Sequence, residues 1–178
     1  MNAQPIIRPA TPADAPAIAV IFAHHIVHGE ASFEVVPPDA GEMAARLAKV
    51  TGAGHPWLVA ELGGEVVGYA YAAPYHAREA YRFTCEDSIY LRADQQGRGL
   101  GKALLAALID AAAASGFRQM IALITAGDGA SIPLHARLGF AEVGRIHAVG
   151  RKHGRWLDVV TMQRALGEGS TTPPLVEP

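Results

Sequence analysis

Hydrophobic and polar positions along this chain follow two different periods, and the changes between them mark the expected elements. Alternating apolar residues predict strands at residues 5–9, 57–62, 66–73, 82–91, 119–124, 140–149 and 156–164. Apolar residues three and four apart predict helices over about residues 12–28, 42–50, 99–115 and 131–138. The order β-α-α-β-β-β-α-β-α-β-β predicts an α/β fold in which one mixed sheet lies between helices.

Turn and cap residues support these boundaries. Thr11 before a proline and Asp39 after two prolines are helix N-caps by type and position. The dipeptides Gly63-Gly64 and His153-Gly154 are typical of tight turns between antiparallel strands. No repeat or second domain is indicated, so we expect a single domain over residues 1–166 and a flexible Gly/Thr/Pro-rich tail over 167–178.

Composition narrows the class of protein. The chain has 178 residues, of which 50% are hydrophobic, enough for one sizeable core. A formal charge of -2 and no interleaving of aromatic and basic residues argue against a nucleic-acid partner. No apolar run approaches the roughly 20 residues that a membrane span needs, and we expect a cytoplasmic protein without a membrane partner. The single cysteine, Cys85, excludes an internal disulfide and is expected in the core.

The segment Gln96-Gly97-Arg98-Gly99-Leu100-Gly101-Lys102 joins a predicted strand to a predicted helix. Closely spaced glycines at a helix start direct free backbone N–H groups and the positive end of the helix dipole at one point, which suits a pyrophosphate. Arg98 and Lys102 add positive charge. The spacing matches neither the dinucleotide-binding fingerprint nor the P-loop. A plain Gly-rich turn that only starts a helix is the alternative.

The motif Gln-x-x-Gly-x-Gly, the element order and the segment from Leu134 to Phe140 together resemble the GCN5-related N-acetyltransferase (GNAT) superfamily. Further segments narrow the resemblance to its phosphinothricin and methionine-sulfone/sulfoximine acetyltransferases: Phe33-Glu34, 68–71, 78–82, 86–90, Leu134-His135 and 150–159. This resemblance covers nearly everything before Gly167. It implies the GNAT fold, with a central mixed, mostly antiparallel sheet flanked by helices, acetyl-CoA as co-substrate, and no metal.

The resemblance also implies how acetyl-CoA binds. Ile89, Tyr90 and Leu91 would pair with the pantetheine like a neighbouring strand, and the N–H of Leu91 is the candidate that polarises the acetyl carbonyl. The segment from Gln96 to Lys102 would hold the pyrophosphate. Ser131 and Asp128 are further candidate contacts, although the group usually has asparagine where this chain has Asp128. That aspartate is also suited to cap the helix that begins near Ser131.

Glu86 is the implied general base, acting directly or through a water. Its reference pKa near 4.3 is low for a group that takes a proton from an amine. Burial must therefore raise this pKa, or a water must relay the proton. The alternative is that Glu86 is a surface carboxylate, and neighbouring Asp87 shows that acids occur here without a role. Because strand residues alternate faces, only one of the pair is expected to face the site unless the strand has a bulge. His135 stands where many relatives have a tyrosine that protonates the leaving thiolate. It is either that acid or a histidine that only packs near the cofactor.

Candidate substrate ligands lie on two loops. Arg78 can grip a carboxylate or phosphinyl group with two parallel hydrogen bonds, and Tyr81 accompanies it. Phe33 and Glu34 would form another wall of the pocket. His24 and His28 have helical spacing suited to a metal, but the glutamate of a zinc-hydrolase motif is missing, so we interpret them as histidines on a helix face.

The sequence therefore predicts an N-acetyltransferase that moves acetyl from acetyl-CoA to the α-amine of a small amino-acid-like compound. The resemblance implies a role in resistance or detoxification, and a homodimer to which residues 150–159 could contribute. One alternative keeps the cofactor but changes the acceptor to a polyamine, an aminoglycoside or a protein amine. Another is a module that senses CoA without turnover. The absence of an acidic run and the presence of Arg78 argue against polycationic acceptors, and the presence of Glu86 argues against a sensor.

Overall fold

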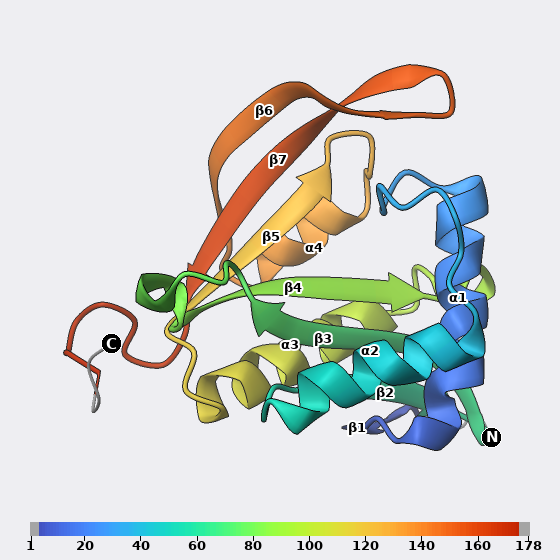
Figure 1. The fold of residues 1–178 in the computed structure, drawn as a ribbon, viewed down its shortest axis with the longest axis horizontal. Helices are drawn as coiled ribbons and strands as arrows, with labels where there is room; N and C mark the ends of the chain where they lie inside the picture. The colour runs from blue at the N-terminus through green and yellow to red at the C-terminus, as the bar shows by residue number, and fades with distance from the viewer. Residues whose placement is uncertain (1–3, 175–178) are drawn as a thin grey trace.

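The computed structural model describes residues 4–174, which form one seven-stranded sheet covered by helices (Figure 1). The sheet has the order β1-β2-β3-β4-β5-β7-β6. Its strands are β1 (Ile6–Pro9), β2 (Trp57–Leu62), β3 (Glu65–Pro74), β4 (Thr84–Leu91), β5 (Gln119–Thr125), β6 (Ala141–Lys152) and β7 (Arg155–Ala165). The helices are α1 (Ala15–His28), α2 (Ala40–Gly52), α3 (Leu100–Ala114) and α4 (Ser131–Arg137), with short 3-10 turns η1 (Pro12–Asp14), η2 (Glu79–Tyr81) and η3 (Ala93–Gln95).

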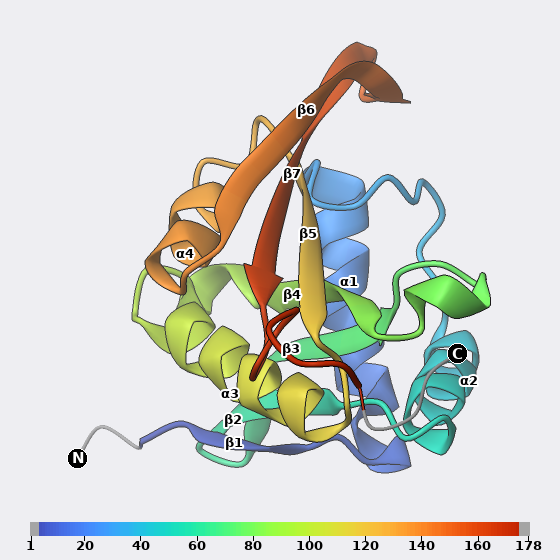
Figure 2. The same cartoon turned by 90° about the vertical axis from the view of Figure 1, so that its left-hand side faces the viewer.

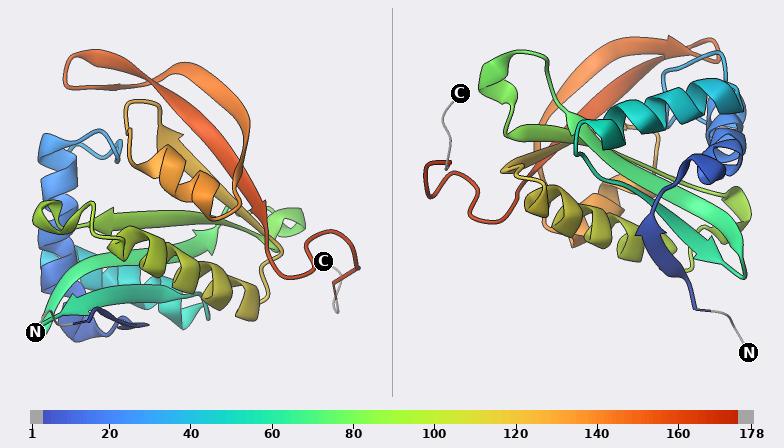
Figure 3. Two further views of the ribbon diagram at one scale, coloured as in Figure 1. Left: turned by 180° about the vertical axis from the view of Figure 1, so that it is seen from behind. Right: turned by 60° about the horizontal axis from the view of Figure 1, so that its bottom comes forward.

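The helices cover both faces of the sheet (Figure 2). Apolar residues of α1 and α2 pack on β2 and β3 around Phe22, Met43 and Tyr69. On the other face, the leucines of α3 pack on β2 to β5 and β7, and residues of α4 join that core. Figure 3 shows the two helical layers from behind and from below. The predicted fold class and element order are confirmed.

Helix caps and tight turns predicted from the sequence are found at the ends of several helices and strands. The side chain of Asp39 accepts a hydrogen bond from the Glu42 N–H at 2.8 Å, as an N-cap does. The turn Gly63-Gly64 has positive φ at both residues, and so does His153-Gly154, which gives each hairpin a two-residue turn of the type that fits strand twist. The expected strand 82–91 begins later, at Thr84, because Arg82 and Phe83 form the turn that follows η2.

All neighbouring strands are antiparallel except β4 and β5. These two pair in parallel over only three positions, from Thr84 opposite Gln119 to Glu86 opposite Ile121. Beyond Glu86, β4 continues to Leu91 bonded to β3 alone, while β5 continues to Thr125 bonded to β7 alone. The sheet therefore opens between β4 and β5, and the hairpin of β6 and β7 stands away from β4 (Figure 1).

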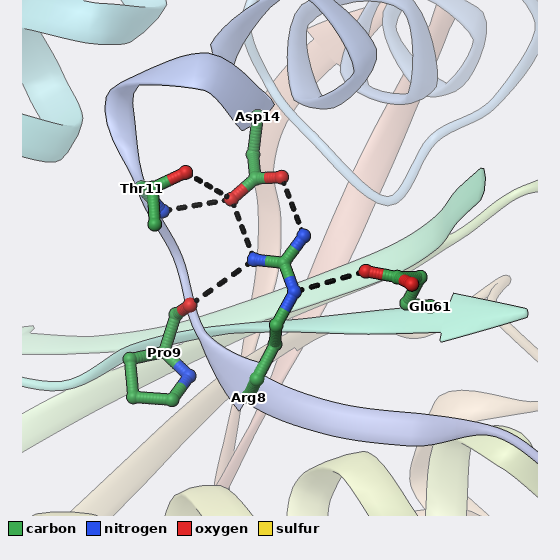
Figure 4. A network of polar contacts seen from close by, with 5 residues as sticks. All are labelled: Arg8, Pro9, Thr11, Asp14 and Glu61. Carbon is green, nitrogen blue, oxygen red and sulfur yellow. Dashed lines mark hydrogen bonds and ion pairs between the residues drawn. The ribbon is translucent and has the colours of Figure 1, made fainter. Parts of the chain in front are cut away.

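A polar network ties the first strand to its neighbours (Figure 4). Arg8 on β1 donates two hydrogen bonds of 2.8 Å to the buried carboxylate of Asp14 and one of 3.0 Å to Glu61 on β2. Asp14 also accepts from the Thr11 N–H at 2.7 Å, which completes the capping box at this helix start. The hydrogen bonds from Arg8 lower the pKa of Asp14 to about 2, although burial opposes the shift.

The end of the described chain contacts the sheet layer. Leu166 is buried, and Arg118 lies close to Glu168 and donates to the Gly169 carbonyl oxygen. Residues 175–178 of the expected tail lie outside the described residues, and the domain boundary at residue 166 stays a prediction. In the described part of the chain, no helix is long and apolar enough to cross a membrane.

Candidate active site

A cavity of about 400 Å³ occupies the opening between β4 and β5. Its walls are Glu86–Tyr90 of β4 and Ala122–Thr125 of β5. The loop residues 31–33 after α1 and the side of α4 that carries His135 close two further sides. Ile146 and Val149 complete it from the β6–β7 hairpin. Residues from β4, β5, β6, α4 and the loop after α1 thus meet where the two parallel strands separate.

The backbone of β4 offers hydrogen-bonding groups along this opening. The Arg92 N–H bonds to the Val67 carbonyl oxygen at 2.8 Å, so Leu91, one residue earlier, directs its own N–H and C=O away from β3. The same alternation directs the groups of Ile89 to the open edge, whereas those of Tyr90 point to β3. Of the three residues expected to pair with pantetheine, two present their backbone to the cavity side.

The side chain of His25 on α1 forms a hydrogen bond with one of these backbone groups. Its Nε2 lies 2.7 Å from the Leu91 carbonyl oxygen. Burial lowers the pKa of His25, and the neutral ring donates its Nε2 hydrogen to that oxygen. The Leu91 N–H is not needed for this bond and remains directed at the opening.

Glu86 and Asp87 lie on opposite faces of β4, as alternation requires. Cys85, Ile89 and Leu91 share the face of Asp87, which is the α3 side, and Tyr90 shares the face of Glu86, which is the α1 side. The expectation that only one of the two acids faces the site is nevertheless wrong, since both line the cavity. The reason is the missing strand pairing: the cavity passes through the sheet and meets both of its faces.

Glu86 is partly buried at the point where β4 and β5 separate. Burial raises the pKa of its carboxyl group, and the negative charge of Asp87 raises it further. Both effects make the carboxylate a stronger base than a solvated glutamate. This is the change that a proton acceptor for an amine requires.

Asp87 and His135 form a buried pair. The His135 Nε2 lies 3.0 Å from the Asp87 Oδ2, and both side chains are 1% exposed. The other ring nitrogen, Nδ1, lies 2.8 Å from the Ser131 carbonyl oxygen. Burial alone would lower the pKa of His135, but the hydrogen bond and charge of Asp87 and the Ser131 carbonyl outweigh it and raise the pKa.

This geometry bears on the two roles considered for His135. Both ring nitrogens already face acceptors of the protein, so the imidazole would have to leave Asp87 before it could protonate a ligand. The second carboxylate oxygen, Asp87 Oδ1, is buried and has no hydrogen-bond partner among residues 4–174. The acid role of His135 stays a prediction.

The glycine-rich segment has the geometry of an anion site. Gly97 and Gly99 have φ of 74° and 81°, which glycine adopts without strain. Within α3 the first N–H bonded to a preceding carbonyl is that of Ala103, to Gly99, so the N–H groups of the first turn lack helical acceptors. A Cβ at Gly101 would lie 3.3 Å from the Leu91 side chain, so the helix start packs closely on the end of β4.

Side chains of this segment divide into two groups. Gln96, Arg98 and Lys102 are exposed, and Arg98 also donates to the Gln95 side chain at 3.2 Å. Leu100 and Gly101 are buried, so they could meet a phosphate only through their backbone. The segment therefore fits the pyrophosphate of acetyl-CoA by backbone N–H groups and by two cations.

Asp128 caps the turn before α4, one of the two roles considered for it. Its Oδ1 accepts from the backbone N–H groups of Ala130 and Ser131, each at 3.2 Å. Asp128 and Ser131 both line the cavity. A carboxylate that serves the local backbone in this way explains why aspartate is accommodated where asparagine is usual.

The substrate candidates are in two separate places. Phe33 lines the cavity, and neighbouring Glu34 is held by two hydrogen bonds from Arg46 of α2, at 2.7 and 3.1 Å. Arg78 and Tyr81 are exposed on the loop that leads into β4 and do not line the cavity. As ligands they would have to contact a substrate that extends beyond it.

The alternative nucleophile and metal interpretations find no support in the geometry. Cys85 is fully buried, its Sγ contacts the Gln119 carbonyl oxygen, and burial raises the pKa of its thiol to about 12. The rings of His24 and His28 lie 4.9 Å apart on α1. Among residues 4–174, no group of three or more His, Cys, Asp or Glu side chains is placed to hold a metal ion.

Three contributors to the site are not predicted from the sequence. Strand alternation directs Asp87 away from the face of Glu86, and His25 lies in no motif. Lys152 supports the loop before Phe33, and no local pattern indicates that contact. A polar residue at a position that alternation assigns to the core is the one signal that could have drawn attention to Asp87.

Comparisons with known proteins agree with this arrangement. Residues 25–140 match the model of the acetyltransferase (GNAT) family. The chain is 52% identical to the phosphinothricin N-acetyltransferase of Alcaligenes faecalis over 162 residues, which are 90% of this chain and 82% of that protein. It is 42% identical to the L-methionine sulfoximine/L-methionine sulfone acetyltransferase of Pseudomonas aeruginosa, covering 94% of this chain and 98% of that one.

Solved structures give the same result. A phosphinothricin acetyltransferase from Sinorhizobium meliloti in complex with acetyl-CoA superposes with a TM-score of 0.93 at 48% identity, covering 98% of this chain and 94% of that one. An acetyltransferase from Salmonella typhimurium with acetyl-CoA also gives 0.93, at 37% identity, covering 98% and 100%. The opened sheet, the glycine-rich helix start and these similarities lead to one conclusion: the chain belongs to the acetyltransferase (GNAT) family.

Proposed function

We propose that this enzyme transfers an acetyl group from acetyl-CoA to the α-amine of a small amino-acid-like substrate of the phosphinothricin, methionine sulfone or methionine sulfoximine type. The observation that carries the proposal is the cavity between β4 and β5, which combines a free backbone edge with the carboxyl group of Glu86. Acetyl-CoA supplies the thioester. Glu86, whose pKa is raised by burial, takes the proton that the attacking amine loses.

The proposed reaction is a direct transfer. The neutral amine nitrogen forms a bond to the acetyl carbon, the carbon–sulfur bond breaks, and the sulfur gains one proton for the one that nitrogen loses. The Leu91 N–H, which points away from β3, would polarise the acetyl oxygen. The first turn of α3 with Arg98 and Lys102 would hold the pyrophosphate.

The choice of acceptor rests on the named relatives and on the surroundings of the cavity. Proteins similar over most of this chain are named for phosphinothricin and for methionine sulfoximine and sulfone. Arg78 and Tyr81, exposed beside the start of β4, would bind the acidic group of such a substrate, and Phe33 and Glu34 would border it from the other loop.

Thiol release from acetyl-CoA by the purified enzyme tests this proposal. We expect release with phosphinothricin, methionine sulfone or methionine sulfoximine, and little with spermidine or an aminoglycoside. Release with the two polycations alone would contradict the substrate class but keep the acetyltransferase. No release with any of the five amines, in a protein that binds CoA, would contradict the proposed function.

We also propose that the enzyme is a cytoplasmic homodimer. Its co-substrate belongs to central metabolism inside the cell. The outer strand β6 is exposed along almost its whole length and presents Val143 to solvent, while Ile146 and Val149, each half exposed, also border the cavity. An apolar strand at a sheet edge is suited to contact a second copy.

A further inference from the structure

The loop that follows α1 forms a wall of the cavity without regular backbone bonding of its own. Residues 29–34 belong to no helix or strand. Ala31, Ser32 and Phe33 nevertheless line the cavity. A segment of this kind keeps one position only if contacts from other elements fix it, because its backbone groups are not paired internally.

Thr125 of β5 donates to the Glu30 carbonyl oxygen at 2.7 Å, and Arg46 of α2 holds Glu34. Three further contacts come from the distant tip of the β6–β7 hairpin. Lys152, the last residue of β6, donates from Nζ to the Ser32 carbonyl oxygen at 2.6 Å. The next residue, His153, lies with its Nε2 3.2 Å from the Gly29 carbonyl oxygen. Arg155, the first residue of β7, forms an ion pair with Glu30.

The tip is built to hold these side chains in place. Lys152 and Arg155 are opposite each other across the two-residue turn His153-Gly154, whose residues both have positive φ. Such turns match the twist of the strands and keep the hairpin end rigid. A second support comes from Gly150: a Cβ there would lie 2.2 Å from a ring carbon of Phe33, so the ring rests directly on the hairpin backbone.

Lys152 is the least expected of these residues. It is 5% exposed, and lysine is almost never fully buried unless it is paired. Burial lowers the pKa of its ammonium, and the charge of Glu30 opposes the shift. A methionine would fill similar space without that cost, so the ammonium is retained for its bond to the loop.

We propose that Lys152 and Arg155 are positioning residues that set the selectivity for the amine, by fixing the loop that places Ser32 and Phe33 at the cavity. This inference rests on the proposed acetyl transfer to small amino-acid-like amines. Neither residue lines the cavity, so both act through the loop. The site for acetyl-CoA, which begins on β4 and α3, does not depend on them.

Kinetics of Lys152→Met tests the inference at saturating concentrations of the second substrate. We expect the KM for the amine to rise about tenfold or more, because a shift of the wall by a fraction of an ångström misplaces the substrate. The KM for acetyl-CoA should stay unchanged and the selectivity among the three amines should shrink. Lys49→Met, the same change at an exposed lysine of α2, is the control and should leave all constants unchanged.

A charge swap provides a second test, which does not require a change in the buried lysine. Arg155→Glu and Glu30→Arg should each raise the KM for the amine, and the double variant should restore it, since only a direct contact can be rescued by reversal. Arg155 is 68% exposed, so its replacement should leave the fold intact.

Several outcomes would overturn the inference. An amine KM within about twofold of the wild type in Lys152→Met, or a swap that rescues nothing, would do so. If Lys152→Met raised the KM for the amine and for acetyl-CoA equally and lowered the Tm, Lys152 would have only a structural role. A wild-type enzyme that acetylates none of the amines contradicts the proposed function instead, and this is seen before any variant is measured.

Discussion

Two adjacent carboxyl groups on β4 have different environments because the strand turns them to opposite faces. Glu86 faces the α1 side with a raised pKa, while Asp87 faces the α4 side and binds His135. Sequence resemblance identified Glu86 and His135 as candidates. It did not identify Asp87, because neither the gap in the sheet nor the contact between residues 48 positions apart is visible in local pattern.

The pair of Asp87 and His135 should make the stability of the enzyme depend on pH. Because the folded state raises the pKa of His135, the stabilisation is fully present below the unfolded value near 6.5 and is lost as pH rises through the folded value. We therefore expect Asp87→Asn to cost about 3 kcal/mol in unfolding free energy near pH 6, and less toward pH 9.

Urea unfolding of the wild type and Asp87→Asn between pH 6 and pH 9 measures this difference. Other charged or titratable groups near the pair are Cys85, Glu86 and Asp128. His28→Gln, at an exposed histidine of α1, is the control and should show no such dependence. A cost for Asp87→Asn that stays constant over this pH range would mean that His135 is neutral in the pair.

At the scale of elements, the parts that the sequence predicts are those with local causes. Caps such as Asp39 and turns such as Gly63-Gly64 act over a few residues, and the structure confirms them. The separation of β4 and β5 depends on pairing between distant strands, and the anchoring of the loop at Ser32 depends on Lys152, 120 residues away. Such contacts leave no periodic signal, so they could not be predicted.

The network around Arg8 joins β1, η1 and β2, and it should stabilise the fold in a way that acid removes (Figure 4). The pKa of Asp14 falls from an ordinary 3.8 to about 2 in the folded state. Its contribution is therefore present above about pH 4 and is lost as pH falls toward 2. Asp14→Asn should lower the unfolding free energy by about 1–2 kcal/mol at pH 7.

Thermal or urea unfolding from pH 7 down to pH 2 checks this prediction, with Asp110→Asn, an exposed acid on α3, as control. The difference between the wild type and Asp14→Asn should shrink as pH falls through 4, whereas the control should follow the wild type throughout. If the difference in unfolding free energy stayed constant down to pH 2, the charge of the Asp14 carboxyl group would not contribute to stability.

At the scale of the whole molecule, the hairpin of β6 and β7 borders the cavity and also carries exposed apolar residues. Ile146 and Val149 line the cavity, and Lys152 contacts the loop after α1. Val143 and Trp156 are exposed and do not line the cavity. The sequence resemblance suggested a homodimer that involves residues 150–159. Trp156 is an exposed apolar residue of that segment, and the exposed Val143 extends the candidate surface along β6.

Light scattering on the purified protein tests the dimer. We expect a mass of twice the chain's 18.7 kDa, and a shift toward the monomer in Val143→Asp, since a charge on the apolar edge opposes its burial and Val143 does not line the cavity. The same change on exposed Val20 of α1, Val20→Asp, should leave the mass unchanged. A wild-type protein that is monomeric at micromolar concentration would contradict the proposal.

The pH profile of kcat/KM measures whether Glu86 takes the proton from the amine, as we propose. Activity should rise with pH as Glu86 ionises, at a pH above the ordinary value for glutamate because burial and Asp87 raise its pKa. Glu86→Gln should lose roughly 100-fold or more in kcat/KM and lack that rise, while both enzymes share the later rise from the amine itself. A Glu86→Gln enzyme with nearly full activity and an unchanged profile would contradict the account.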